Sequence, residues 1–328
     1  MHFLKNTSAR MGMGCWAIGG PFWDGDTPLG YSGTNDSDSL AAIEASWDCG
    51  IRLFDTSAAY GAGHSETLLG QSLTKKDDAI IVSKFGHSID SDSRQMTGPQ
   101  YDADYIRWSI EQSRQRLQRD QIDVMLLHLN DLSVEEAKPV FETLAKIRDE
   151  GKIAAYGWST DFPEKLKQTA EPEGFQAVEY AMNIFFDAPS MNQVTQDENL
   201  VGLIRSPLAM GILTDKYSDG TKVATDDIRG TNATWLSYFR DGVISEDFAR
   251  QLEAIRELIS TGGRSPAQGA LCWLLATHKH VFPVPGAKNA HQAIENAKAV
   301  EFGPLPQNTM LEIEEILKRP PEGAPQER

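Results

Sequence analysis

Three apolar runs in the first half of the sequence each end on a polar residue that can do chemistry. The run 52–55 ends on Asp55, the run 79–84 ends on Lys84, and the run 122–128 ends on His128. Tyr60 lies in the segment that follows the first run. If the runs are consecutive strands of a parallel barrel, their carboxyl ends meet at one rim, and the four side chains lie together.

These four side-chain types can act together as a proton donor. A free tyrosine has a pKa of about 10, and a lysine ammonium beside it stabilises the phenolate. An aspartate holds the lysine charged and aimed, and a histidine can position a carbonyl oxygen. We interpret the set as protonating a carbonyl that receives hydride, which contributes about 10²–10⁴-fold in rate. Each residue alone also fits an ordinary structural role, so the interpretation depends on the joint arrangement.

The surrounding pattern alternates short apolar runs with amphipathic stretches. Strands are predicted at 12–18, 52–55, 79–84, 122–128, 153–158, 177–182, 200–205 and 281–284. Helices are predicted at 39–49, 66–73, 101–117, 134–149, 162–169, 246–260, from Ser265 onward and at 308–317. Eight strands alternating with helices predict an α/β fold, a (β/α)8 TIM barrel with extra helices and long active-site loops. We expect a single domain over 1–328, with 319–328 as a mobile tail.

Two segments look like excursions from the barrel. Residues 19–36 and 215–242 are polar but contain several aromatic side chains. Such loops often cover active sites, although the rings could equally well serve only to pack the loops onto the barrel.

Composition excludes several classes of partner. The net charge of −16 argues against nucleic acid and against an anionic membrane surface, which both require a basic face. No run of about 18 apolar residues and no signal peptide is seen. The three cysteines form no Cys-x-x-Cys pair, and the histidines form no metal motif. We therefore expect a cytoplasmic protein without a metal.

Six motifs occur in order along the chain. They are Phe-Asp-Thr-Ser-Ala-Ala-Tyr-Gly-Ala-Gly-His-Ser-Glu at 54–66, Val-Ser-Lys at 82–84, Leu-Leu-His at 126–128, Gly-Trp-Ser-Thr at 157–160, Arg-Ser-Pro-Leu-Ala-Met-Gly at 205–211 and Pro-Gly-Ala-Lys at 285–288. The ordered set resembles the aldo-keto reductase family, over about residues 12–296. The resemblance implies a (β/α)8 barrel that reduces aldehydes and ketones with NADPH. It also implies a catalytic tetrad of Asp55, Tyr60, Lys84 and His128.

The resemblance further implies a nicotinamide site. Ser159 and Thr160 match a pair that holds the carboxamide, with Thr160 in place of the family's asparagine. Glu179 stands where the family has glutamine, with Gln176 as a less favoured alternative. A glutamate there could accept a hydrogen bond from the carboxamide but not donate one. Arg205 matches the position that stacks on the ring. The loop after it would bind the pyrophosphate, through Ser206, Leu208, Gly211, Leu213 and Lys216.

The segment from Gly286 to Asn296 resembles the helix start that binds the adenosine 2′-phosphate. Free N–H groups and the Lys288 ammonium would favour an anion there. Gln292 stands where relatives carry a second base, and Glu295 and Asn296 match residues at the adenine edge. NADPH is therefore favoured as cofactor, and NADH remains an alternative.

The substrate side is implied by Trp16, Trp23, Tyr60 and His128, which would line an aromatic pocket for a hydrophobic or sugar-derived carbonyl. The sequence carries no signal for oligomeric state. Three other functions stay open. They are a nucleotide-binding regulatory subunit on the same barrel, an NAD-linked sugar or alcohol dehydrogenase, and another barrel enzyme such as a sugar-phosphate isomerase or a metal-dependent hydrolase.

Overall fold

Eight parallel strands form the centre of the molecule. The computed structural model describes residues 4, 7, 9–170, 173–217, 220–233 and 236–319. In order around the sheet, the strands are β1 (Gly12–Gly14), β4 (Leu53–Asp55), β5 (Ile80–Phe85), β8 (Ile122–Leu127), β9 (Ile153–Ser159), β10 (Phe175–Ala181), β11 (Val201–Arg205) and β14 (Val281–Pro283). A bridge between Gly14 and Gly286 brings the last strand back to the first. The predicted (β/α)8 barrel is confirmed.

The strands are apolar on both faces because both faces are buried. One layer of side chains fills the barrel, including Leu53, Val82, Val124 and Leu203. The other layer packs outward against the helices, including Phe54, Ile81 and Met125. Such strands appear in the sequence as continuous hydrophobic runs, which is why the runs were recognisable.

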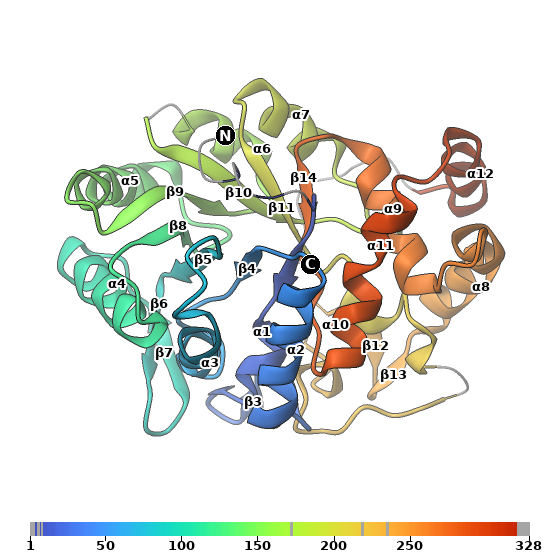
Figure 1. Ribbon diagram of the computed structural model, residues 1–328, viewed down its shortest axis with the longest axis horizontal. Coiled ribbons are helices and arrows are strands. Elements are labelled where there is room, and N and C mark those ends of the chain that lie inside the picture. The colour runs from blue at the N-terminus through green and yellow to red at the C-terminus, as the bar shows by residue number, and fades with distance from the viewer. Residues whose placement is uncertain are drawn as a thin grey trace.

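Helices surround the strands (Figure 1). They are α2 (Asp36–Asp48), α3 (His64–Leu73), α4 (Ala103–Leu117), α5 (Val134–Asp149), α6 (Pro163–Thr169), α7 (Pro189–Asp197), α8 (Glu246–Ser260), α9 (Pro266–Thr277), α10 (Ala290–Ala297), α11 (Ala299–Phe302) and α12 (Gln307–Leu317). A capping box of Ser265 and Gln268 begins α9, as the sequence predicts. Helices α2 and α10 lie side by side, so a segment from early in the chain packs against one from late in the chain (Figure 1).

The excursions, together with a hairpin in the loop after β5, form small sheets that the sequence pattern did not predict. Strands β2 (Trp23–Asp24), β3 (Thr27–Pro28), β6 (His87–Asp90) and β7 (Gln95–Pro99) form one sheet in the order β3-β2-β7-β6. Strands β12 (Phe239–Arg240) and β13 (Val243–Ile244) form a hairpin. Strands of two to five residues are too short to show periodicity.

The first predicted strand is wrong beyond Gly14. The chain turns at Cys15, and residues Trp16–Gly19 form the short helix α1. A short apolar run is compatible with either strand or helix, so its pattern did not distinguish them. Helix α7 was also missed. Of the tail, Arg319 donates a hydrogen bond to the Ile184 carbonyl and pairs with Glu314, while 320–328 lie outside the described residues.

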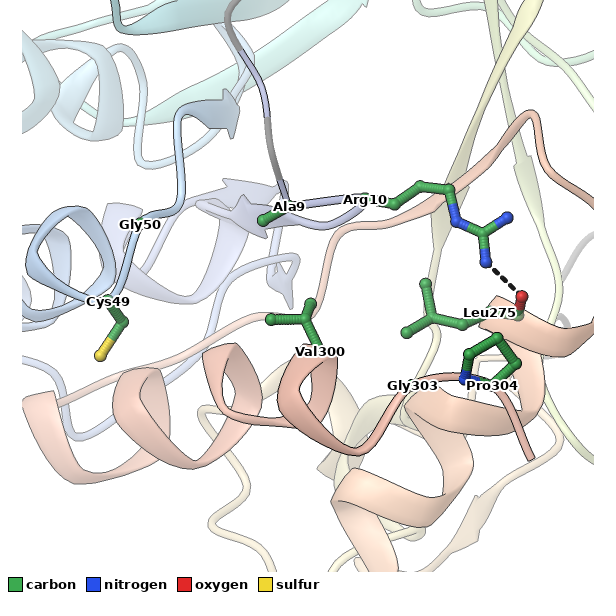
Figure 2. A pocket seen from close by; sticks show the side chains of 8 residues that line it. All are labelled: Ala9, Arg10, Cys49, Gly50, Leu275, Val300, Gly303 and Pro304. Carbon is green, nitrogen blue, oxygen red and sulfur yellow. Dashed lines mark hydrogen bonds between the residues drawn. The ribbon is translucent and has the colours of Figure 1, made fainter. Parts of the chain in front are cut away.

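A cavity of about 330 Å³ lies at the end of the barrel where the strands begin (Figure 2). Arg10 points along its wall, and its guanidinium donates to the carbonyls of Leu275 and His278. Those bonds tie the chain before β1 to the end of α9. The donors are therefore occupied within the fold, and the cavity belongs to the structural end of the barrel.

In the part of the chain that the structure describes, no helix is both long and apolar enough to cross a membrane.

Candidate active site

The Lys84 ammonium is the centre of a buried cluster at the opposite rim. Its Nζ lies 2.7 and 2.8 Å from the two carboxylate oxygens of Asp55, and 2.9 Å from the Thr56 carbonyl. The Tyr60 hydroxyl lies 3.3 Å from the same nitrogen. The Lys84 side chain is fully buried. Three of the residues singled out in the sequence therefore make direct contact.

The loop after β4 places Tyr60 through its backbone. The Thr56 N–H donates to the Val82 carbonyl, and the Ala58 N–H donates to the Lys84 carbonyl. Gly61, with φ of +60°, follows Tyr60, and a Cβ there would lie 1.9 Å from the Gly19 carbonyl oxygen. Only glycine fits this close approach, so the loop is held against Gly19 at the end of α1.

Burial and charge fix the protonation states. Burial raises the pKa of Tyr60, although the Lys84 ammonium acts to lower it. Burial alone would lower the pKa of Lys84, but Asp55 and Glu179 together raise it above its ordinary value. Tyr60 is thus a protonated phenol beside a charged ammonium. The sequence argument expected Lys84 to depress the tyrosine pKa, but in the free protein the cost of burying a phenolate is larger.

His128 follows β8 and is neutral. Burial, and then the charge of Lys84, hold the pKa of His128 well below its usual range. Its Nδ1 lies 3.2 Å from the Ser57 hydroxyl, which also accepts a hydrogen bond from the Ala59 N–H. The hydrogen bond fits either direction, and a Ser57 hydroxyl that donates to Nδ1 leaves the ring proton on Nε2. The ring stands at 88° to Tyr60, with the centroids 6.0 Å apart.

His87 lies beside His128 and was missed. The two imidazole centroids are 5.5 Å apart, and burial lowers the pKa of His87. Its buried Nδ1 has no hydrogen-bond partner among the described residues. The residue begins β6, a strand that the sequence pattern did not predict.

Glu179 contacts the same lysine. Its Oε2 lies 3.1 Å from Lys84 Nζ, and its Oε1 accepts a hydrogen bond of 3.3 Å from the Ser159 hydroxyl. Its side chain is 1% exposed. The expected neighbourhood of Ser159 and Glu179 is present, but the ion pair with Lys84 was not foreseen. Lys84 therefore has two carboxylate partners, because Asp55 is the other.

Arg205 and Thr160 have partners that the sequence did not reveal. Arg205, at the end of β11, pairs with Asp161. The Asp161 carboxylate also accepts the Ala181 N–H at 2.7 Å, which fixes its position. The Thr160 hydroxyl donates to the Asn130 carbonyl at 2.8 Å, so it is engaged in holding the loops together.

Of the expected substrate residues, Trp16 lies beside Tyr60, and Trp23 lies in the β3-β2-β7-β6 sheet. The rings of Trp16 and Tyr60 stack, with centroids 5.9 Å apart and an interplanar angle of 19°. Phe22 joins Tyr60 in the small apolar cluster at this rim. Trp23 pairs through its backbone with Gln95 of β7.

A group of cations lies where the two excursions meet. The Lys288 ammonium donates to the Ser32 carbonyl at 2.7 Å and lies 3.9 Å from Asp227 Oδ2. Arg229 pairs with Asp227 through two bonds of 2.7 Å and lies over the Tyr31 ring. Burial, followed by the charge of Arg229, lowers the pKa of Lys288 to about 8. Lys216 contributes further positive charge here, since it also depresses that pKa. Arg229 and Asp227 were not predicted.

Other predicted cofactor residues are used in local structure. The N–H groups of Gly211 and Leu213 both donate to the Leu208 carbonyl, and Ser206 has φ of +53°. The Gln292 amide oxygen accepts the Lys288 N–H at 2.8 Å, so Gln292 shapes the helix start. Asn296 donates to the Gly286 carbonyl, and the Glu295 carbonyl accepts a bond from Gln268. No cluster of His, Cys, Asp and Glu in the described ranges could hold a metal ion.

Comparison with known proteins identifies the family. The model of the aldo/keto reductase family matches residues 10–318. The chain belongs to this family. Aldo-keto reductase YhdN of Bacillus subtilis is 30% identical over 82% of this chain and 78% of its own length. A putative voltage-gated potassium channel subunit beta of Schizosaccharomyces pombe is 28% identical over 89% of this chain and 88% of its own. An aldo-keto reductase from Klebsiella pneumoniae, solved in complex with NADPH, superposes with a TM-score of 0.66 at 20% identity, covering 97% and 94% of the two chains.

In (β/α)8-barrel enzymes the rim where the strands end carries the active site, and the opposite end serves stability. The buried cluster around Lys84 lies where the strands end, and the cations around Lys288 lie beside it. The Arg10 contacts lie at the other end. This division is general for such barrels.

Proposed function

We propose that this aldo-keto reductase transfers hydride between NADPH and an aldehyde or ketone, a small or sugar-derived carbonyl, with Tyr60 as proton donor. One observation supports this most strongly. The Tyr60 hydroxyl lies 3.3 Å from a fully buried ammonium that two carboxylates hold in place. Such a phenol is poised to give its proton to an oxygen that is gaining negative charge.

Each step of the proton transfer has a side chain to perform it. The Tyr60 hydroxyl protonates the carbonyl oxygen as the carbon gains hydride. The Lys84 ammonium stabilises the phenolate that remains. The neutral His128 ring donates a hydrogen bond from Nε2 to the same oxygen and aligns it. Asp55 holds Lys84 charged and aimed.

The residues present fit a phosphorylated nicotinamide cofactor, which when bound supplies the hydride. Three cations, Lys216, Arg229 and Lys288, outnumber the two acids Asp226 and Asp227 at the junction of the excursions, which suits anionic phosphates. In the cluster around Lys84, Glu179 Oε2 forms an ion pair with Lys84 but has no well-aligned hydrogen-bond donor among the described residues. Ser159, Glu179 and Arg205 would hold the nicotinamide, and Lys288 at the start of α10 would hold the 2′-phosphate. NADPH is therefore the proposed cofactor, with NADH as the alternative.

The decisive variant is Tyr60→Phe, which removes the hydroxyl that carries the acidic proton and keeps the ring. We expect carbonyl reduction to fall by about 10²–10⁴-fold, because the proton donor is lost. NADPH affinity should stay nearly intact, as measured by quenching of tryptophan fluorescence. Tyr101→Phe is the matched control, since its hydroxyl contacts only the exposed Glu136 at 2.8 Å. Undiminished reduction by Tyr60→Phe would show that another group delivers the proton.

A regulatory role on the same barrel is the second candidate. It is favoured by the similarity to a putative channel beta subunit. A protein with that role alone would bind NADPH tightly and yet turn over no carbonyl in a broad substrate screen. The reductase proposal instead requires turnover that depends on Tyr60. We further propose a cytoplasmic location, in keeping with cysteines 15, 49 and 272, which are all free thiols.

A further inference from the structure

The cluster around Lys84 contains more negative than positive groups. Asp55 and Glu179 share the one Lys84 ammonium, while Arg205 pairs with Asp161. Three carboxylates therefore face two cations. Nearby groups do not compensate, because His128 is held neutral and burial keeps the Cys15 thiol protonated. With all three carboxylates ionised, one negative charge is left over in the described part of the site, and burial, followed by the charge of Glu179, raises the pKa of Asp55 well above its usual range.

A surplus charge at this depth is costly unless something balances it. Asp55 and Glu179 are 5% and 1% exposed, so water screens them poorly. A glutamine at position 179 would make the same hydrogen bond with Ser159 and carry no charge. Either a proton on the carboxylate pair or a cation in the mouth of the barrel can balance the surplus. Buried groups of this kind tend to serve function.

The geometry of hydride transfer places one candidate cation here. The substrate oxygen must lie within hydrogen-bond reach of the Tyr60 hydroxyl. The carbon that accepts hydride must then lie about 3–3.5 Å from the nicotinamide ring. Since Tyr60 and Glu179 contact the same Lys84 nitrogen, a ring within hydride reach of the substrate lies in the same mouth of the barrel as Glu179. The oxidised nicotinamide ring carries a positive charge, and the reduced ring is neutral.

We propose that Glu179 makes the site bind the oxidised, cationic nicotinamide cofactor in preference to the reduced, neutral one. This inference rests on the proposed function. The proposal gives Glu179 a role beyond contact with the carboxamide. The oxidised and reduced cofactors differ at the ring by one positive charge and one hydride, and the Glu179 carboxylate distinguishes them by that charge. In reduction the oxidised cofactor then leaves slowly as product, and in alcohol oxidation it is bound readily as substrate.

The test compares two dissociation constants in each of several variants. NADP⁺ and NADPH are titrated separately into the full chain and followed by calorimetry or tryptophan fluorescence. Glu179→Gln should weaken NADP⁺ relative to NADPH by about tenfold or more, the size expected for a charge pair several ångströms apart near a protein surface. A new hydrogen bond from the glutamine amide affects both forms alike, so it cancels in the ratio.

Two control variants separate charge from shape. Glu179→Asp keeps the charge and should keep most of the preference. Glu150→Gln removes one charge from the exposed end of α5, at the other end of the barrel, and should leave the ratio unchanged. Thermal unfolding of each variant shows whether it is folded.

The outcomes are distinct. An unchanged ratio in folded Glu179→Gln overturns the proposal. If that variant does not fold, wild-type protein is titrated with oxidised and reduced nicotinamide mononucleotide, which lack the adenosine half, and tighter binding of the reduced form overturns it. If wild-type protein binds neither NADP⁺ nor NADPH, the proposed function fails instead, before the role of Glu179 is tested.

Discussion

At the scale of single residues, the role proposed for Lys288 predicts that cofactor choice depends on pH. Its pKa of about 8 in the free protein reflects burial and the nearby Arg229. Below that pH it is an ammonium and can hold a 2′-phosphate, which is ionised throughout this range. We expect the preference for NADPH over NADH to fall as the pH rises from about 7 to about 9.5.

The measurement is the ratio of the two dissociation constants at several pH values. Lys288→Arg should show a flat ratio, because a guanidinium stays charged. Lys288→Ala should weaken NADPH far more than NADH near neutral pH. A pH-independent ratio in the wild type, or equal weakening of both cofactors by the alanine variant, would remove Lys288 from the phosphate site.

Residue types and order predicted part of the candidate site. Asp55, Lys84 and Tyr60 meet as expected, because consecutive strands end at one rim. The second carboxylate on Lys84 could not be predicted, since it depends on side-chain length and direction across the barrel. Asp161 and Arg229 were missed for a related reason. The partner of Asp161, Arg205, is 44 residues away along the chain, and the partner of Arg229, Asp227, lies in a loop without periodicity.

At the scale of elements, the start of α9 offers a clear test. The Ser265 hydroxyl accepts the Gln268 N–H, and Gln268 in turn bonds to the Ser265 N–H and to the Glu295 carbonyl. Ser265→Ala should lower the free energy of unfolding by about 1 kcal/mol, because the Gln268 N–H in the first turn loses its side-chain acceptor.

The control is Ser245→Ala at the start of α8, where the serine makes no side-chain cap bond. Urea unfolding of the two variants should show the larger loss at Ser265. Equal losses would mean that the capping box adds nothing beyond the serine itself.

The long elements were predicted well, and the short ones were not. Helices α5 and α8 match their predicted bounds, because each has an amphipathic face of four turns and a serine N-cap. Helix α7 was missed. Its N-cap position is Ala188, which makes no side-chain cap bond. Its buried face includes the polar residues Asn192 and Thr195.

At the scale of the whole molecule, buried neutral histidines make the fold sensitive to acid. Burial, then the charge of His278, lowers the pKa of His280 to about 4, and His128 is shifted in the same direction. Below pH about 6.5 the unfolded chain binds protons that the folded state cannot. The contribution of these histidines to the free energy of unfolding is therefore fully present near neutral pH and is lost as the pH drops toward 4.

His280→Gln removes one of these groups from a site far from the rim. The variant should lose less stability than the wild type between about pH 7 and about pH 5, by about 1–2 kcal/mol in urea unfolding. An identical loss in both proteins would show that His280 does not contribute to the acid sensitivity.

The overall architecture was predictable because barrel strands are buried on both faces and alternate with helices. The number of strands then specified a closed barrel. That residues 1–328 form a single domain stays a prediction. How the excursions pack could not be predicted, since it depends on contacts between distant loops. The bond from the Ile228 N–H to the Gly30 carbonyl is one example.

The seam between β1 and β14 has a consequence for how the chain folds. These strands are among the shortest in the barrel, and they lie at opposite ends of the chain. During synthesis the first strand emerges long before its partner, so its edge stays unpaired until nearly the whole chain is made. Closing so large a loop is entropically slow, which makes this seam a late event in folding. A chain ending before Val281 would keep two open strand edges and be prone to aggregate.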